Sequence, residues 1–294
     1  MNAEKIVGCL SGGMLGDAYA SRAERGGVGA GAYEPDWRFT DDTQLTLATC
    51  EAVCEAGRVD PERIAGAMAR WFQRGDVTGV GAVTLGALRA LACGGHWALC
   101  GLGGERAAGG GAAMRIAPCV MMLDPSDLFE RMTLRDVARL THKNEEAWAG
   151  ALGHALALRF VMANPTSSFA EVAEAVCGEL FDSRTRDNLR VLVEHRVGRY
   201  EDVVELVGAS GFAASCVPVG IWAGSRACEV GVTQSFEQIV AGGGDTDTIA
   251  ALAGQVFGAA KGVGALPAGW IDEVVGGGEA SATFARLARA VCES

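Results

Sequence analysis

Aromatic residues are scarce in this sequence. Phe, Trp and Tyr make up 6% of its 294 residues, whereas glycine occurs 42 times. Small residues let backbones approach closely, so a large core of this composition is expected to consist of tightly packed helices rather than aromatic-filled sheets. Alternating β-branched and aromatic runs, the signs of hairpins and βαβ units, are also missing. The sequence therefore predicts an all-α fold, and the lack of a dividing linker predicts a single compact domain over residues 1–294.

Positive charge and long apolar runs are lacking as well. The 25 Lys and Arg residues against 36 Asp and Glu give a formal net charge of −11, which is unfavourable for a nucleic-acid-binding surface. No stretch reaches the ~20 apolar residues that span a bilayer, and the first residues lack the core of a signal peptide. The ten cysteines form no C-x-x-C pair, as is usual in a reducing compartment. We expect a cytoplasmic monomer that contacts no membrane and forms no stable complex with nucleic acid.

What is present is helical periodicity, interrupted by Gly and Pro. Helices are expected over residues 6–20, 43–56, 61–73, 83–92, 112–122, 133–140, 145–162, 169–180, 185–195, 200–207, 212–223, 235–240, 247–260 and 281–292. In the first of them, Gly8, Gly12 and Gly16 fall on one helical face, where a second helix can pack against bare backbone. Residues 21–37 are expected to be irregular, either as a mobile lid or as plain surface.

Two acidic clusters stand directly before expected helices. They are Thr40–Thr43 (Thr-Asp-Asp-Thr) and Asp245–Thr248 (Asp-Thr-Asp-Thr). Each one alone is explained by capping, because Asp and Thr at a helix start satisfy free backbone N–H groups. Together they hold more carboxylates than capping requires, and like charges ~4 Å apart repel by about 4 kcal/mol at an effective dielectric constant of 20. If the clusters converge, bound cations would remove that cost.

Oxygen ligands of this kind select hard cations. Carboxylate and hydroxyl oxygens suit Mg²⁺, Mn²⁺ or Ca²⁺. Zinc is disfavoured, because the chain has only four histidines and no His-Glu-x-x-His motif or Cys–His ligand set. The composition of the clusters therefore favours a site for a hard divalent cation.

Five motifs follow one another in an order that is typical of one family. They are Gly8-x-x-x-Gly12-x-x-x-Gly16-Asp17-Ala18, Thr40–Thr43, Gly111–Pro118 (Gly-Ala-Ala-Met-Arg-Ile-Ala-Pro), Thr141-His142 and Gly243–Thr248. With them the sequence resembles the ADP-ribosylglycohydrolase family, typified by dinitrogenase reductase-activating glycohydrolase. Pro267 and Trp270 also resemble the C-terminal Pro-x-x-Trp of that family. Any one motif is weak evidence, whereas five in order are strong.

The resemblance implies a fold, a reaction and a set of metal ligands. The fold is a compact, all-α, orthogonal multi-helix bundle with two Mg²⁺ (or Mn²⁺) ions in a central cleft. The reaction is hydrolysis of the bond between C1″ of ADP-ribose and an acceptor, which is a protein, a nucleic acid or a small molecule. The family's metal-ligand positions match Thr40, Asp41, Asp42, Asp245, Asp247 and Thr248.

Catalytic and substrate-binding residues are implied in the same way. The catalytic carboxylates are Glu24, at the place of a family glutamate close to the metals, and Asp42; Glu34 competes with Glu24 because it is nearer to Thr40 along the chain. The positions that match substrate contacts are Gly109, Gly110, Gly111, Met114, His142, Gly211 and Phe212.

Several of these residues also have plain structural explanations. Gly109–Gly111 either hold a ribose or diphosphate by their backbone N–H groups or form a simple Gly-rich connection. His142 either contacts substrate or is structural. Phe212 either stacks on adenosine or packs in the core. Arg115 is expected to tie helices together from a buried position rather than to bind phosphate.

Two positions depart from the family pattern. Gly110 stands where the usual Gly-Asn-Gly carries an amide, and Ala107 stands where the arginine-directed branch has an aspartate that would pair with a guanidinium. The linkage is therefore left open, with Glu105 or Glu34 as substitutes for that acid. Two other functions are kept as alternatives. One is a Mg²⁺-dependent nucleotide phosphohydrolase, although its usual Glu-x-x-Glu or His-Asp motifs are missing, and the other is a non-catalytic, ADP-ribose-binding relative.

Overall fold

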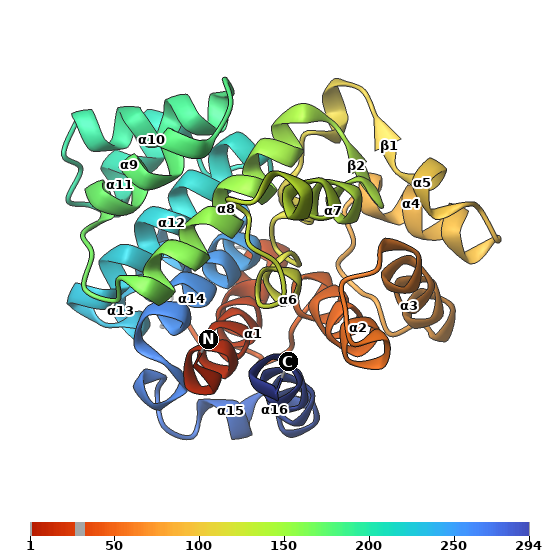
Figure 1. Ribbon diagram of the computed structural model, residues 1–294. Helices are drawn as coiled ribbons and strands as arrows, with labels where there is room; N and C mark the ends of the chain where they lie inside the picture. Colours follow the sequence, from red (N-terminus) through yellow and green to blue (C-terminus); the bar gives the residue numbers. More distant parts are fainter. Residues whose placement is uncertain (1, 27–32, 294) are drawn as a thin grey trace.

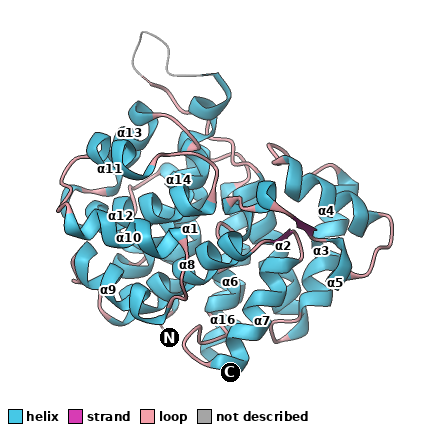
Figure 2. Ribbon diagram, turned by 90° about the horizontal axis from the view of Figure 1, so that it is seen from above, coloured by secondary structure: helices cyan, strands magenta, loops and turns pink. Residues whose placement is uncertain are grey.

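The computed structural model describes residues 2–26 and 33–293, and nearly all of its regular structure is helical (Figure 1 and Figure 2). In chain order the α-helices are α1 (Ala3–Gly26), α2 (Asp41–Ala56), α3 (Pro61–Arg74), α4 (Ala82–Ala92), α5 (Trp97–Cys100), α6 (Ala117–Val120), α7 (Leu128–Arg139), α8 (Glu145–Ala163), α9 (Phe169–Glu179), α10 (Arg184–Glu194), α11 (Tyr200–Val207), α12 (Ala213–Val230), α13 (Val232–Gly242), α14 (Thr246–Lys261), α15 (Trp270–Glu273) and α16 (Gly277–Glu293). The predicted all-α fold is confirmed. None of the described helices is long and apolar enough to cross a membrane.

Helices α1 and α14 form the central pair of the fold (Figure 1). A Cβ atom added to Gly12 would lie 2.2 Å from the backbone oxygen of Gly254, and one added to Gly16 would lie 2.0 Å from that of Ala250. The predicted packing of the glycine face against bare backbone is confirmed. Because residue numbers fall along α14 as they rise along α1, the two helices run antiparallel. The C-terminal part of α1 therefore lies beside the N-terminus of α14.

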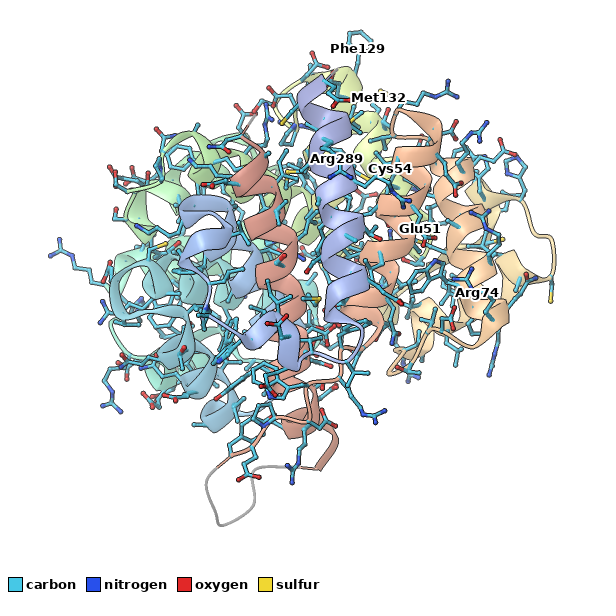
Figure 3. The ribbon with its side chains drawn as sticks, turned by 90° about the horizontal axis from the view of Figure 1, so that it is seen from below. Glu51, Cys54, Arg74, Phe129, Met132 and Arg289 are labelled. Carbon is cyan, nitrogen blue, oxygen red and sulfur yellow. The ribbon has the colours of Figure 1, made fainter. Side chains whose placement is uncertain are left out.

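The remaining helices surround this pair. Helix α14 also packs against α12 and α8, while α9 and α10 cover the outer side of α8 and α12. Helices α2, α3 and α4 pack in sequence on the other side of the molecule (Figure 1). Helix α16 packs alongside α1 and α2, and Figure 3 shows Arg289 of α16 beside Cys54 of α2. Helices α2 and α14 both pack against α1 and against each other.

The structure corrects three local predictions. Instead of one helix over 112–122 there are a 3-10 turn at Gly110–Ala112 and the short α6, because Pro118 lacks a backbone N–H and starts a helix more readily than it continues one. Within the segment 21–37, residues 21–26 belong to α1, and residues 27–32 lie outside the described part. No strand was expected, yet β1 (Leu102–Gly103) pairs in parallel with β2 (His142–Lys143), shown in magenta in Figure 2.

Candidate functional site

The starts of α2 and α14 meet beside the C-terminal part of α1. Carboxylate oxygens of Asp17, Asp42 and Asp247 lie within 4.8 Å of one another. Oxygens of Glu24, Asp245 and Asp247 do the same, so that Asp247 belongs to both groups. The two acidic clusters, which are far apart in the sequence, thus converge on one small volume.

Helix capping does not account for the two clusters. The N-cap residues of α2 and α14 are Thr40 and Asp245, and neither side chain accepts a capping hydrogen bond. By comparison, the Asp60 side chain accepts two backbone N–H groups at the start of α3. The clusters instead face each other, since the hydroxyl of Thr248 donates to Oδ2 of Asp42 at 3.5 Å. The N-cap side chains are therefore not engaged in capping, and of the other cluster groups Oδ1 of Asp247 accepts one first-turn N–H, that of Thr248, at 2.8 Å.

Asp17 lies beneath the first cluster, although the sequence assigned it no role of its own. Its side chain is completely buried. It accepts the backbone N–H and the hydroxyl of Thr40, at 3.0 and 2.8 Å, and those of Thr43, at 3.0 and 2.6 Å. These donors all come from the first turn of α2, so Asp17 ties that turn to α1. The signal for it was Gly16, because a residue beside a close-packed glycine lies near the helix contact.

Burial and mutual repulsion favour protonation of these carboxyl groups in the metal-free protein. Burial, and then the charge of a neighbouring aspartate, raises the pKa of Asp17 to about 7 and that of Asp245 to about 8. Burial and the neighbouring aspartates raise the pKa of Glu24 to about 8. The same two causes raise the pKa values of Asp41 and Asp42 well above their usual range.

A bound divalent cation would lower the pKa values of these carboxyl groups again. Among the described residues no donor reaches the enclosed Oδ1 of Asp42, and a buried carboxylate oxygen without a partner is costly. A cation supplies both the missing partner and the opposite charge, and it favours the ionised form of every carboxylate around it. The residues present therefore fit a hard metal ion.

The acidic clusters lie at a cleft of about 520 Å³. Twelve of the residues expected at the site line it: Glu24, Asp41, Asp42, Gly109, Gly110, Gly111, Met114, His142, Gly211, Asp245, Asp247 and Thr248. Thr40 is buried and does not line the cleft. The sequence missed Gly79 in the connection from α3 to α4 and Thr84 in the first turn of α4, which also line the cleft. It missed Arg106 and Ser210 as well. Nothing in their local pattern marks them, because only tertiary packing brings them there.

The glycine run 109–111 is shaped by close contacts. A Cβ atom on Gly110 would lie 2.6 Å from Sγ of Cys216, and one on Gly111 would lie 2.8 Å from Cε1 of His142. An asparagine at position 110 would therefore collide with Cys216, which gives a physical reason for this departure from the family pattern. The N–H of Gly110 donates to the oxygen of Gly211 at 2.9 Å, so this N–H group is already used within the protein.

Phe212 lies beside a second pocket of about 560 Å³. An antiparallel bridge joins Gly109 to Phe212, and Ser210 lines both the cleft and this pocket. The Phe212 side chain is 51% exposed, so packing in the core does not explain it. The Gly109–Phe212 bridge therefore separates the cleft from the second pocket. The exposed ring of Phe212 lies on the side of the second pocket.

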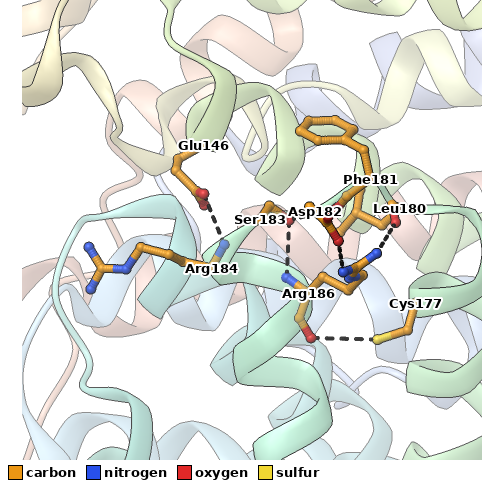
Figure 4. Close-up of polar contacts among 8 residues, drawn as sticks. All are labelled: Glu146, Cys177, Leu180, Phe181, Asp182, Ser183, Arg184 and Arg186. Atoms are coloured by element: carbon orange, nitrogen blue, oxygen red, sulfur yellow. Dashed lines mark hydrogen bonds and ion pairs between the residues drawn. The ribbon is translucent and has the colours of Figure 1, made fainter.

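Part of the second pocket is built by the junction of α8 and α10 (Figure 4). Glu146 of α8 accepts the backbone N–H groups of Arg184 and Thr185, at 2.9 and 3.3 Å, and so caps α10. Figure 4 shows the side chain of Arg184 directed away from these contacts. The Glu146 carboxylate is therefore used within the fold, whereas Arg184 lines the pocket and its side chain takes no part in these hydrogen bonds.

The acids proposed as substitutes lie apart from the two acidic clusters. Glu34 is exposed and is absent from the cleft lining, where Glu24 is present. Glu105 lines the second pocket rather than the cleft. Ala107 is buried, with 1% of its surface exposed. Of the two competing glutamates, the structure brings Glu24 to the acidic clusters.

Comparisons with known proteins agree on one family. The ADP-ribosylglycohydrolase family model matches residues 2–294. An uncharacterized protein of Archaeoglobus fulgidus is 30% identical over 80% of this chain and 74% of its own length. The ADP-ribosylhydrolase ARH3 of Mus musculus is 26% identical over 99% of this chain and 92% of its own. The ADP-ribosylarginine hydrolase Tri1 of Pseudomonas putida is 24% identical over 92% of this chain and 74% of its own.

A solved structure is similar as well. It is described as an ADP-ribosylglycohydrolase-related protein complex, and it aligns with a TM-score of 0.76 at 26% identity, covering 98% of each chain. The similarity extends over nearly the whole molecule rather than over one motif.

Proposed function

Because the chain belongs to the ADP-ribosylglycohydrolase family, we propose that it hydrolyses the glycosidic bond between C1″ of ADP-ribose and an acceptor. The family match confirms the predicted resemblance and, at the level of the family, the predicted class of enzyme. The observation that carries the proposal is the convergence of two acidic clusters beside Glu24 at one cleft. Charge of this density suits the cationic character that builds on a ribose ring as its glycosidic bond breaks.

The metal ligands in this proposal are Thr40, Asp41, Asp42, Asp245, Asp247 and Thr248, and they hold two Mg²⁺ or Mn²⁺ ions. Among the proposed ligands, Asp42 and Asp245 belong to two different groups of neighbouring carboxylates, and Asp247 belongs to both groups, which supports a pair of sites. The acid and hydroxyl oxygens match the preference of these cations. When bound, such ions supply Lewis-acid contacts that orient ribose hydroxyls and an attacking water.

Glu24 is the better placed of the two proposed catalytic carboxylates. Asp42 is enclosed, with 3% of its surface exposed, and its Oδ2 accepts the Thr248 hydroxyl. Glu24 is exposed at the end of α1, with a carboxylate oxygen near those of Asp245 and Asp247. It can therefore accept a proton from a water in the cleft, while Asp42 acts as a ligand.

The ADP-ribose moiety is proposed to extend from the two acidic clusters past Gly109–Gly111 towards Phe212. Met114, His142 and Gly211 would form the wall of this path, and the exposed ring of Phe212 offers a face on which adenine can stack. Ala107 supplies no carboxylate for a guanidinium, and Glu105 lies in the second pocket. These positions weigh against an arginine acceptor and in favour of another linkage.

A linkage panel tests the proposal directly. The protein with Mg²⁺ is incubated with Arg-, Ser-, nucleobase- and O-acetyl-linked ADP-ribose, and free ADP-ribose is followed by chromatography. We expect release from at least one linkage other than arginine, and none after EDTA treatment. Release from no linkage would contradict the proposed activity, and ADP-ribose binding without release would identify a non-catalytic relative.

Product analysis separates the remaining alternative. A nucleotide phosphohydrolase would break the diphosphate and yield AMP or phosphate, whereas the proposed reaction leaves ADP-ribose intact. Asp245→Ala serves as the ligand control, because loss of a central carboxylate should abolish Mg²⁺ binding by calorimetry. Unchanged Mg²⁺ affinity of this variant would refute the proposed ligand set.

A further inference from the structure

Arg115, Thr141 and His142 form a chain of hydrogen bonds that ends at the wall of the cleft. The Arg115 guanidinium, which is completely buried, donates to Oγ1 of Thr141 at 2.6 Å. Oγ1 of Thr141 lies 2.8 Å from Nδ1 of His142. Thr141 has no exposed surface, and His142 has only 3%. The chain is therefore shielded from water until it reaches the far edge of the imidazole ring.

The charge of Arg115 is held by the end of a helix rather than by an acid. Its guanidinium also donates to the backbone oxygens of Val137, at 3.3 Å, and Ala138, at 3.5 Å. These are carbonyl groups in the last turn of α7, where the helix dipole favours a cation. Among the described residues no ion pair to Arg115 is present. Arg115 is thus a fixed donor that always occupies one acceptor site on Thr141.

Proton accounting then determines the direction of the next hydrogen bond. The Thr141 hydroxyl has one proton and accepts from Arg115. If Nδ1 of His142 carried a proton, it would donate to Thr141, and the hydroxyl proton of Thr141 would have no acceptor among the described residues. A buried donor without a partner costs about 1–3 kcal/mol. If Thr141 donates to Nδ1 instead, its hydroxyl proton has an acceptor. The buried Nε–H of Arg115 lacks a partner in either arrangement and does not favour one over the other.

The remaining ring nitrogen, Nε2, is directed at the cleft. His142 lines the cleft between Gly109 and Gly111, and Cβ atoms added to these glycines would lie 3.3 and 3.4 Å from Nε2. Among the described residues Nε2 has no hydrogen-bond partner, and it is not one of the enclosed unpartnered atoms. Burial, and then the charge of Arg115, lowers the pKa of His142 to about 3. A neutral ring with its proton on Nε2 is consistent with both observations.

We propose that Arg115 and Thr141 hold His142 as the Nε2–H tautomer, so that the cleft presents a fixed ring N–H donor to an oxygen atom of the ADP-ribose moiety. His142 is then a hydrogen-bond donor to substrate and not an acid or a base. Arg115 and Thr141 are positioning residues that act through it. The substrate part of this inference rests on the proposed function, whereas the tautomer does not. The glycines at 109 and 111 leave the space through which the donor is reached.

Nitrogen NMR of the ring tests the tautomer without any ligand. In protein labelled with ¹⁵N-histidine, ring shifts separate protonated from unprotonated nitrogens, and a His142→Gln variant assigns the signal. We expect Nε2 to be protonated and Nδ1 to be unprotonated near neutral pH in the unsubstituted protein. Protonation at Nδ1, or at both nitrogens, would overturn the proposal whatever reaction the protein catalyses.

Variants of Thr141 test the positioning role. Thr141→Val removes the hydroxyl with little change in shape and should give a mixture of tautomers, whereas Thr141→Ser should restore the Nε2–H form. Thr133→Val on α7 is the matched control and should leave the ring signal unchanged. If the ring signal of Thr141→Val equals that of the unsubstituted protein, Thr141 does not direct the tautomer and the proposal fails.

Binding of ADP-ribose tests the substrate contact. Loss of one well-placed donor should weaken ADP-ribose binding by about tenfold in His142→Phe, which has no ring N–H. Thr141→Val, which keeps part of the Nε2–H form, should weaken binding by less than this, and Thr141→Ser should restore it. Titration of the same variants with ADP locates the acceptor oxygen. If the variants lose affinity for ADP as they do for ADP-ribose, the oxygen belongs to the ADP portion. If their affinity for ADP is unchanged, the oxygen belongs to the ribose near the proposed metal site. Unchanged ADP-ribose affinity in both variants would overturn the contact. Failure of the unsubstituted protein to bind ADP-ribose would instead contradict the proposed function, while the tautomer result stands.

Discussion

One buried carboxylate organises the first turn of the proposed metal site. Asp17 accepts four hydrogen bonds, two from Thr40 and two from Thr43. Because its oxygens are occupied in this way, they are poorly available as metal ligands. Asp17 instead fixes the position of the turn that carries Asp41 and Asp42. A ligand set that is held in place before the ion arrives loses less conformational entropy on binding.

Replacing Asp17 by Asn should therefore weaken metal binding although every proposed ligand remains. The new amide group would place donors against the N–H and hydroxyl donors of Thr40 and Thr43. We expect Mg²⁺ affinity, measured by calorimetry, to fall by about 10- to 100-fold, the usual effect of losing a residue that orients metal ligands. Asp187→Asn, at an exposed position on α10, is the control. Equal affinities of the two variants would argue against this role.

Substitution of Glu24 separates catalysis from metal binding. Glu24→Gln keeps the size of the side chain and removes its ability to accept a proton. We expect kcat for ADP-ribose release to fall by about 10²- to 10⁴-fold, with Mg²⁺ affinity nearly unchanged. Glu34→Gln, which alters an exposed residue outside the cleft, should behave like the unsubstituted protein. A small effect of Glu24→Gln on kcat would shift the role of base to Asp42.

At the scale of elements, the contact between α1 and α14 aligns the two halves of the site. Gly8, Gly12 and Gly16 lie against backbone atoms of α14. This contact places Asp17 and Glu24 of α1 beside the first turn of α14, which holds Asp247. The hydroxyl of Thr246 donates to the backbone oxygen of Ala20 at 3.1 Å and fastens the same ends together. Helix spacing and site geometry are thus set by the same residues.

Gly12→Ala tests this coupling. A methyl group at this position would lie 2.2 Å from the oxygen of Gly254, so the two helices must move apart. We expect the free energy of unfolding to fall by about 1–3 kcal/mol, the usual cost of overpacking, and Mg²⁺ binding to weaken as well. Gly178→Ala on α9, which meets no atom within 4 Å, should instead leave stability unchanged or raise it by up to about 1 kcal/mol. If the two variants have equal free energies of unfolding, close packing at Gly12 does not contribute to stability.

At the scale of the whole molecule, the buried carboxyl groups at the site link stability to pH. Asp17 and Asp245 have pKa values of about 7 and about 8 in the metal-free fold, whereas an unfolded aspartate titrates near 3.9. Between these values the folded state binds more protons than the unfolded chain. Stability of the metal-free protein therefore falls as pH rises from about 4 to about 8.

Bound Mg²⁺ should remove this dependence, because it stabilises the ionised carboxylates. We expect the Tm in EDTA to fall between pH 5 and pH 8, and the increase in Tm caused by Mg²⁺ to be largest at pH 8. Mg²⁺ at 100 times its Kd contributes about 2.7 kcal/mol to stability. Thermal unfolding at a series of pH values measures both effects, with Asp245→Ala as the variant that should not respond to Mg²⁺. A metal-free Tm that rises with pH would contradict the raised pKa values.

Local sequence patterns were enough to predict most of the helices and the residue types of the site. The helix over 200–207 has the predicted bounds, and the glycine face of α1 packs as expected, because both depend on contacts that repeat along one helix. Ordered motifs were also sufficient to identify the family. The extent of the single domain, the number of ions and the roles of the site residues stay predictions.

Tertiary structure alone decided what depends on segments that are distant in the chain. It brought Glu24 rather than Glu34 to Asp245 and Asp247, buried Asp17 under Thr40, and placed the α3–α4 connection on the cleft. It also exposed Phe212 beside a second pocket and paired β1 with β2. Local sequence reports the preferences of a segment for helix, turn or burial. The distances between charged groups on different helices, and so the site itself, arise only when those helices pack.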